Sequence, residues 1–300
     1  IGMNVRDLRY VVAVAEQRHF GRAAEACFVS QPTLSTQLKK LEETLGAKLI
    51  ERTNRQVMLT DAGEQIVAQA RRVLFEVNTL TAMAEQHADP LGGEFKLGVI
   101  PTLAPYLLPK ILSPISAALP NLKLQLTEAQ TGSLTSMLKQ GDLDAVLLAL
   151  PLNDENLQEY KLFVEPFYFA IPSDHKKATR KYITVAELEG EEILLLEDGH
   201  CLREQALDVC RSHRATENAN FRATSIETLR QMVSAGVGTT LVPKLAVPDV
   251  VGQKQANVRY LKFRGEVPHR NVGLCWRNSS TRAVLLEALA KTLARTLANA

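Results

Sequence analysis

The spacing of apolar residues changes once along this chain, near residue 90, and that change limits the folds that the chain can adopt. Before it, apolar side chains recur at helical intervals, whereas from Glu94 onward short apolar runs alternate with helical stretches. The change falls at residues 89–93, Asp-Pro-Leu-Gly-Gly, whose proline and paired glycines do not continue a helix. We therefore expect a helical part followed by an α/β part of about 200 residues.

Apolar runs in the second part have the length and composition of buried strands. Strands that alternate with helices predict parallel sheets, which bind ligands at the carboxyl ends of their strands. The second part is longer than one sheet needs, so we expect two α/β subdomains that face each other across a cleft. The first subdomain comprises residues 94–164 and 268–300, and the second comprises residues 165–267. The predicted strands are FKLGVI, LQLTEA, AVLLAL, PFYFAIP, EILLLE, TTLVP and VGLCW, and the predicted helices span 103–118, 132–140, 202–213, 225–236 and 281–298.

Residues 19–45 have the pattern of two helices joined by a tight turn. Small residues favour a short helix that ends near Cys27, and Ser30 is a good N-cap for a second helix with Pro32 in its first turn. Short polar side chains at the start of a helix, with lysines behind them, suit a recognition helix in the DNA major groove. The residues of this helix that we expect to contact DNA are Ser30, Gln31, Pro32, Thr33, Ser35, Thr36, Gln37 and Lys39.

A β-hairpin wing is predicted at residues 48–60, with Arg52 and Arg55 near its tip. Residues 18–55 contain seven Lys and Arg against four Asp and Glu, although the whole chain has 35 against 33. The overall balance excludes a protein that coats nucleic acid, whereas the local excess fits one small DNA footprint per subunit. An ordinary helical hairpin with a polar face is the alternative, and we assign residues 3–60 to a winged helix-turn-helix.

A seven-residue repeat of apolar side chains runs from Ile66 to Ala84. It follows Asp61, which we expect to cap the helix with Glu64 three residues later. The stripe predicts a linker helix over 61–90 that pairs with a second copy; a helix lying on its own domain is the alternative. Because one recognition helix spans few base pairs, we expect a homodimer that assembles to a homotetramer.

Residues 3–60 and the linker helix resemble LysR-type transcriptional regulators, and residues 91–300 look like their regulatory domain, an α/β fold similar to periplasmic binding proteins. DGHCLREQALDVC at 198–210 and FRATSIETLRQMVSAGVGTTLVPKLAVP at 221–248 are similar to the peroxide-sensing members of that family. The resemblance implies a regulator, mainly an activator of antioxidant genes, that binds double-stranded promoter DNA, contacts RNA polymerase and responds to hydrogen peroxide. It also implies a thiol reductant of glutaredoxin or thioredoxin type for resetting, no cofactor and no enzymatic activity.

Cys201 and Cys210 are nine residues apart, and the segment between them favours a helix. Nine helical residues rise by about 13.5 Å and turn by about 900°, which places the two thiols on opposite faces. A disulfide needs Cα atoms within about 7 Å, so the pair cannot be oxidised without unwinding the helix. Two inert buried thiols are the alternative; within the 198–210 segment we favour a reversible two-state switch.

The residues around Cys201 are those expected of a reactive thiol. Cys201 lies near a helix start and beside His200 and Arg203, and positive charge there favours its thiolate. The thiolate attacks peroxide and becomes a sulfenic acid, which then condenses with Cys210. Glu204 departs from the shorter Asp of relatives, which leaves any specific contact of that carboxylate open. From the resemblance, the residues expected to bind peroxide are Thr102, Thr131, His200, Arg203 and Arg270.

Other functions are compatible with parts of this pattern. One is a regulator of the same family that binds a small metabolite in the cleft and has inert cysteines; another is a cysteine-dependent peroxidase, for which the sequence supplies no route of re-reduction. A zinc site at Cys201 and Cys210 with His200 and His213 is disfavoured, because one helix cannot aim all four inward. No apolar run reaches the roughly 18–20 residues of a membrane-spanning helix, and no secretory signal is recognisable, so we expect a cytoplasmic location.

Overall fold

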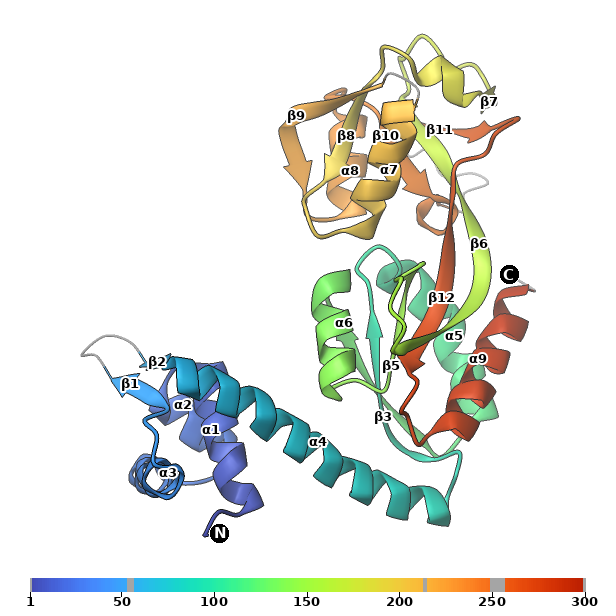
Figure 1. Cartoon of the computed structure of the whole chain (residues 1–300). Helices are drawn as coiled ribbons and strands as arrows, with labels where there is room; N and C mark the ends of the chain where they lie inside the picture. Colours follow the sequence, from blue (N-terminus) through green and yellow to red (C-terminus); the bar gives the residue numbers. More distant parts are fainter. Residues whose placement is uncertain (1, 53–56, 213–214, 249–256, 299–300) are drawn as a thin grey trace. The chain divides into compact units, whose positions relative to one another are not determined.

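Helices and one β-hairpin make up the N-terminal part of the chain. The computed structural model describes residues 2–52, 57–212, 215–248 and 257–298, and the chain divides into two units, Ile1–His87 and Ala88–Ala300. The N-terminal unit contains α1 (Val5–Gln17), α2 (Phe20–Ala26), α3 (Gln31–Leu45), β1 (Ile50–Arg52), β2 (Val57–Leu59) and all but the last residue of α4 (Asp61–Ala88) (Figure 1).

The predicted pair of helices with a tight turn is confirmed at α2 and α3. His19 caps α2, because its Nδ1 accepts hydrogen bonds from two backbone N–H groups at 3.1 and 3.2 Å. Ser30 caps α3, as predicted, and its Oγ accepts from the N–H of Thr33 at 3.3 Å. Both caps satisfy N–H groups that have no partner within the helix. Between the helices, Phe28 takes a left-handed conformation with φ 56°, which turns the chain sharply.

The wing is present as the antiparallel pair β1 and β2, and its tip, residues 53–56, lies outside the described residues. The predicted cap of α4 at Asp61 is wrong. Asp61 is already helical, and Thr60 Oγ1 accepts from the N–H of Gly63 at 2.9 Å. The same hydroxyl donates to the carbonyl of Lys48 at 2.6 Å, so Thr60 fastens the wing to α4 as well as capping it.

The C-terminal unit alternates strands with helices, as predicted. In chain order its elements are β3 (Gly93–Val99), α5 (Ala104–Ala118), β4 (Leu122–Glu128), α6 (Thr131–Gln140), β5 (Ala145–Leu150), β6 (Leu157–Pro172), β7 (Tyr182–Ile183), the 3-10 helix η1 (Val185–Leu188), β8 (Glu192–Leu196), α7 (Cys201–Ser212), β9 (Thr216–Ala223), α8 (Ile226–Ser234), β10 (Thr240–Pro243), the 3-10 helix η2 (Lys244–Ala246), β11 (Val258–Phe263), β12 (His269–Arg277) and α9 (Ala283–Ala298).

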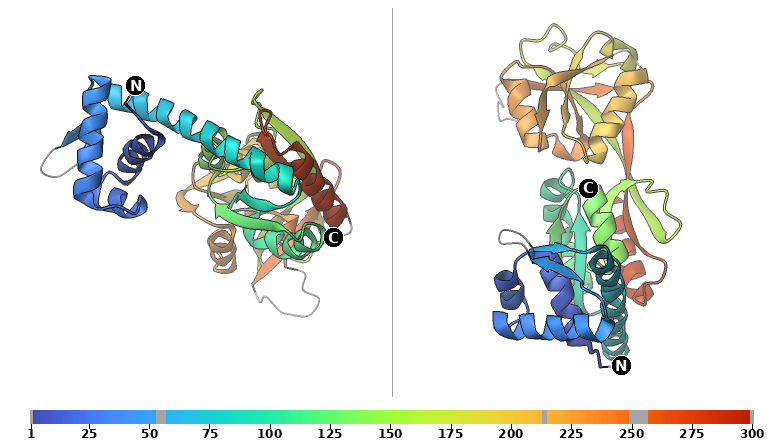
Figure 2. Two further views of the ribbon diagram at one scale, coloured as in Figure 1. Left: turned by 90° about the horizontal axis from the view of Figure 1, so that it is seen from below. Right: turned by 60° about the vertical axis from the view of Figure 1, so that its left-hand side comes forward.

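Pairing between these strands is mixed. β3 pairs in parallel with β4 and β5, and β8 pairs in parallel with β9. The expected parallel arrangement is wrong at β6 and β12. These two strands run in opposite directions and pair antiparallel with each other. Both strands are long and run from one group of elements to the other (Figures 1 and 2). They therefore connect the two halves of the unit.

Among the described residues of the C-terminal unit, buried side chains gather in three cores. The first core lies among β3, β5, β12, α5 and α9. The second and third cores involve β6, β8, β10 and β11, and alternate residues of β8 point into one or the other. The predicted α/β fold is confirmed. Representative members are Phe95, Leu147 and Leu289 for the first core, Leu194, Leu229 and Val242 for the second, and Ile193, Leu195 and Leu261 for the third.

Candidate functional site

Cys201 is the first residue of α7 and follows the turn that leaves β8. Its side chain is half-buried and packs against the first core. Cys210, in the same helix, is 2% exposed and belongs to the third core. Both thiols are free. The helix predicted across the pair is confirmed, and it holds the two sulfurs in different cores.

Cys210 is a poor nucleophile in this arrangement. Burial, and to a smaller extent the negative charge of Glu217, raises the pKa of the Cys210 thiol to about 11. Because the thiolate is the reactive species, the partly exposed Cys201 is the better candidate of the two for the first attack on an oxidant. The other cysteines pack as expected: Cys275 lies in the first core with a pKa that burial raises to about 12, and Cys27 packs against the core of the N-terminal unit.

Arg203 anchors the first turn of α7 to the strands behind it. Its Nη1 and Nη2 donate to the two carboxylate oxygens of Glu217 at 2.8 and 3.1 Å, and Nη1 also donates to the carbonyl of Leu196 at 3.1 Å. Its Nε lies 2.8 Å from Oδ1 of Asp198. The side chain is 5% exposed, so these charge-assisted bonds fix the position of the helix start. The guanidinium donates to the protein rather than into an open space, and it holds Cys201 in place.

His200 lies directly before Cys201 and is 5% exposed. Burial lowers the pKa of His200, and the carboxylate of Glu197, 3.9 Å away, offsets that effect only in part. The imidazole is therefore neutral near neutral pH, which corrects the expectation that it adds positive charge beside Cys201. A neutral imidazole donates at one nitrogen and accepts at the other, so it can still hydrogen-bond a peroxide.

Thr102 and Arg270 are brought together by the fold. Thr102 follows β3, and its Oγ1 accepts a hydrogen bond from Nη1 of Arg270 at 2.8 Å, while its carbonyl accepts from Nη2 at 3.1 Å. Arg270, on β12, is fully buried and its Nε donates to Oε2 of Glu165 at 2.7 Å. The proton of the Thr102 hydroxyl has no acceptor among the described residues, so it is available to a ligand. The sequence analysis missed Glu165, although a lone carboxylate at the start of the apolar run PFYFAIP is a sign of a buried ion pair.

Thr131 begins α6 after β4, the parallel neighbour of β3. Its Oγ1 is buried and has no hydrogen-bond partner in the described part of the chain. Next to it, Nε2 of Gln130 donates to Glu197 at 3.4 Å and to the carbonyl of Asp198 at 3.5 Å. Gly199 has φ 94°, and a Cβ there would lie 2.3 Å from the side chain of Gln130. The turn before α7 therefore lies against the start of α6.

These contacts place hydroxyl groups at the carboxyl ends of neighbouring parallel strands, where such sheets bind ligands. A buried hydroxyl without a partner is uncommon and marks a place that a small polar molecule can satisfy. In the described part of the chain, no cluster of three or more His, Cys, Asp and Glu side chains is placed to hold a metal ion. None of its helices is long and apolar enough to cross a bilayer.

The candidate DNA-binding surface is the polar face of α3. Leu34, Leu38 and Leu41 are buried beneath it. Arg52 ends β1 with its side chain outside the described residues, and Arg55 lies in segment 53–56, which is also outside them. Of the predicted contact residues, Ser30, Gln31, Pro32, Thr33, Thr36 and Lys39 are exposed, and Ser35 and Gln37 are partly exposed.

Residues 5–64 match the bacterial regulatory helix-turn-helix proteins of the lysR family, and residues 88–298 match the LysR substrate binding domain. The chain belongs to the LysR family. Relatives of this LysR-family chain include the DNA-binding transcriptional dual regulator OxyR of Escherichia coli strain K12, which is 49% identical over 291 residues that cover 97% of this chain and 95% of the relative. The hydrogen peroxide-inducible genes activator of Haemophilus influenzae is 45% identical over 278 residues, covering 93% and 92% of the two chains.

Solved structures of OxyR proteins share the fold of this LysR-family chain. Full-length OxyR from Pseudomonas aeruginosa, with one cysteine replaced by aspartate, matches with a TM-score of 0.77 and 37% identity over 98% of this chain and 95% of that one. Crystal structures of the oxidised and reduced forms of OxyR match with a TM-score of 0.64 and 43% and 42% identity, each over 70% of this chain and 98% of that one. The resemblance expected from the sequence is confirmed.

Proposed function

We propose that this protein is a hydrogen-peroxide-sensing, DNA-binding transcriptional regulator switched by a reversible disulfide between Cys201 and Cys210. The observation that carries the proposal is the placement of two free thiols in one helix, one half-buried at its start and the other buried in a different core. Relatives named as hydrogen peroxide-inducible genes activators support the effector. Solved oxidised and reduced forms of OxyR support a redox switch.

The chemistry takes two steps. The Cys201 thiolate attacks one oxygen of hydrogen peroxide, so that an S–O bond forms, the O–O bond breaks, and the leaving hydroxide takes up a proton to become water. In the second step the Cys210 sulfur attacks the sulfenic sulfur, an S–S bond forms, and the S–O bond breaks with release of a second water. Sulfur is oxidised and peroxide is reduced, and no metal or cofactor takes part.

Side chains around Cys201 have separate roles in the first step. The Thr102 hydroxyl, which accepts from Arg270, and the unpartnered hydroxyl of Thr131 donate to the peroxide oxygens and orient the O–O bond. His200, as a neutral imidazole, donates a hydrogen bond to the leaving oxygen, and the proton that converts the leaving hydroxide to water comes from solvent. Arg203 acts indirectly, because it holds the start of α7 through Glu217.

The second step requires α7 to unwind. Its two sulfurs are separated by about 13.5 Å along an intact helix, whereas a disulfide needs Cα atoms within about 7 Å. Unwinding withdraws Ala206 and Cys210 from the third core. The new disulfide then holds the altered state, which changes the surface of the C-terminal unit, the spacing of paired DNA-binding units and thereby contact with promoter DNA and RNA polymerase.

Assembly and resetting complete the proposal. On α4, Val73, Leu80 and Met83 are 38%, 68% and 44% exposed, an apolar stripe that supports pairing of two linker helices and, with a second interface, a homotetramer. A cytoplasmic dithiol reductant of glutaredoxin or thioredoxin type would return the disulfide to two thiols. The protein consumes peroxide once per oxidation, so it acts as a sensor and not as an enzyme.

The test is a thiol titration with mass spectrometry before and after one equivalent of peroxide. We expect loss of two thiols per chain and a Cys201–Cys210 crosslink, with no crosslink in Cys201→Ser. Cys275→Ser is the matched control, because that thiol is buried away from the pair and its variant should form the crosslink normally. A peroxide response that persists in Cys201→Ser would instead favour a regulator with inert cysteines and a small metabolite as effector.

A further inference from the structure

A cavity of about 350 Å³ lies beside β6, where α5, η2 and the end of α9 approach that strand. Its volume falls within the range of small-molecule sites. Phe163, Tyr168 and Leu245 are among the residues that line it, and so are two lysines, Lys110 and Lys244. The cavity contains none of the residues to which we assign contact with peroxide or with DNA.

The charges around this cavity do not balance. Glu165 forms part of its wall, but both oxygens of that carboxylate are occupied: Oε1 accepts from the N–H of Leu245 at 2.8 Å and Oε2 accepts from Arg270 at 2.7 Å. Arg270, which does not line the cavity, therefore neutralises the charge of Glu165. Neither Lys110 nor Lys244 forms an ion pair with any residue that the structure describes. The cavity thus combines apolar side chains with two lysines that form no ion pair with the residues that the structure describes.

We propose that this cavity binds a small amphipathic carboxylate, with its apolar body against Phe163, Tyr168 and Leu245 and its carboxylate between Lys110 and Lys244. An apolar wall with a few polar groups that fix orientation is the usual make-up of a ligand site. The two lysines come from α5 and η2, so a bound carboxylate would connect these elements. A doubly charged inorganic anion fits less well, because it would leave the apolar walls uncovered.

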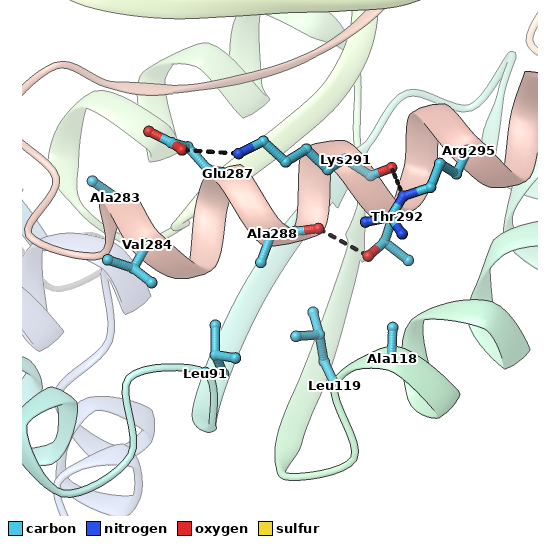
Figure 3. Close-up of a pocket in the computed structure, with 10 residues that line it drawn as sticks. All are labelled: Leu91, Ala118, Leu119, Ala283, Val284, Glu287, Ala288, Lys291, Thr292 and Arg295. Atoms are coloured by element: carbon cyan, nitrogen blue, oxygen red, sulfur yellow. Dashed lines mark hydrogen bonds and ion pairs between the residues drawn. The ribbon is translucent and has the colours of Figure 1, made fainter.

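A second hollow in the same unit provides a comparison. It lies between α9 and the end of α5 and has a volume of about 440 Å³ (Figure 3). There the lysine, Lys291, is already paired with Glu287 at 3.3 Å along the exposed side of α9. Because Lys291 already has a carboxylate partner and lies outside the cavity beside β6, it provides a matched control position.

The experiment is isothermal titration calorimetry of the reduced full-length protein with three probes. Sodium 4-phenylbutyrate has an apolar body and a carboxylate, 4-phenylbutanamide has the body alone, and inorganic phosphate has the charge alone. We expect one saturable site per chain for 4-phenylbutyrate, with a Kd below about 1 mM, and binding at least about tenfold weaker for the other two. Because the calorimeter cell contains no peroxide, the measured affinity does not depend on the thiol switch.

Variants locate the site. Lys110→Gln and Lys244→Gln should each weaken 4-phenylbutyrate binding by roughly tenfold, and Lys291→Gln should leave it unchanged. Val164→Trp, at a half-exposed wall residue, should abolish binding by filling the cavity. The proposal is overturned if 4-phenylbutyrate shows no saturable binding, if the amide binds equally well, or if Lys291→Gln weakens binding while the two cavity lysines do not matter.

Discussion

At the scale of single residues, the ion pair of Glu165 and Arg270 is a buried interaction next to Thr102, one of the proposed peroxide-binding residues. Both side chains are essentially unexposed, and their atoms approach to 2.7 Å. Removing one partner leaves a buried charge without compensation, so Glu165→Ala should lower the free energy of unfolding by about 3–5 kcal/mol. Urea denaturation followed by the fluorescence of Trp276, the single tryptophan, measures this, because that residue lies in the first core.

Glu287→Ala is the control for this prediction. It removes an exposed ion pair with Lys291 on α9, and such pairs contribute little. Its unfolding curve should therefore lie close to that of the unchanged protein. Equal effects of the two variants would mean that burial does not strengthen the pair at Glu165.

His200 gives the protein a pH dependence of stability whose sign follows from its surroundings. Burial lowers the pKa of His200 from its ordinary value of 6.5, so below that pH the unfolded chain takes up a proton that the folded chain resists. The unfolded state then binds more protons, and stability falls as the pH drops through this range. In His200→Gln the loss of unfolding free energy between about pH 7.5 and pH 5 should be smaller. Identical losses in the two proteins would contradict a buried neutral imidazole.

How far these roles could be predicted depends on sequence separation. The motif around Cys201 was informative because its residues are contiguous, and α7 keeps them together. The role of Glu165 could not be recognised from the sequence, because its ion-pair partner Arg270 lies 105 positions away in the sequence. The charge of Arg203 was visible, but its pairing with Glu217 depends on the position of β9. Local patterns single out a candidate reactive residue, whereas buried pairing requires the tertiary structure.

At the scale of elements, α7 is the segment that the proposed switch requires to change on oxidation. Its backbone hydrogen bonds protect amide hydrogens from exchange while the helix is intact. Treatment with one equivalent of peroxide should therefore speed hydrogen exchange across α7, while the amides of α9 keep their protection. Cys210→Ser, which still oxidises at Cys201 but cannot form the crosslink, should retain slow exchange. If α7 exchanges equally fast in that variant, unwinding does not depend on the disulfide.

The start of α4 depends on a glycine. A Cβ added at Gly63 would lie 2.1 Å from the carbonyl oxygen of Leu49, and a backbone atom cannot move aside as a side chain can. Gly63→Ala should therefore destabilise the N-terminal unit by more than about 1 kcal/mol, although alanine is the better helix former. Gly132→Ala in α6, where a Cβ has open space, is the matched control and should be neutral or slightly stabilising. Thermal unfolding followed by circular dichroism compares the two.

Sequence periodicity predicted helices better than strands. α3 and α4 show apolar residues at helical spacing, and both are present. β9, TENANFRA, was missed because its sequence is largely polar, and only tertiary pairing with β8 makes it a strand. β6 was predicted only over its apolar end, yet it continues back to Leu157 because β12 pairs with it along that length.

At the scale of the whole molecule, DNA binding should depend on salt through the lysines of α3. Lys39 is 77% exposed and lies 4.0 Å from Glu43, a distance that leaves its charge available to a phosphate. Each phosphate contact releases counterions, so log K falls as log salt rises. Removing one contact makes this negative slope shallower by about 0.9 for each bound subunit. Lys39→Gln should show this shallower slope on a nonspecific duplex, measured by fluorescence anisotropy at several salt concentrations.

Lys123→Gln is the matched control, since that lysine is exposed on β4 of the C-terminal unit, outside the proposed DNA-binding surface. Its slope should equal that of the unchanged protein. If the two variants have the same slope, Lys39 does not contact phosphate and the DNA-binding surface differs from the polar face of α3. If Lys39→Gln alone is shallower by about twice the single-contact value, two copies bind together, because each contributes one lysine. The same measurement therefore tests both the surface and the pairing of subunits that the linker helix predicts.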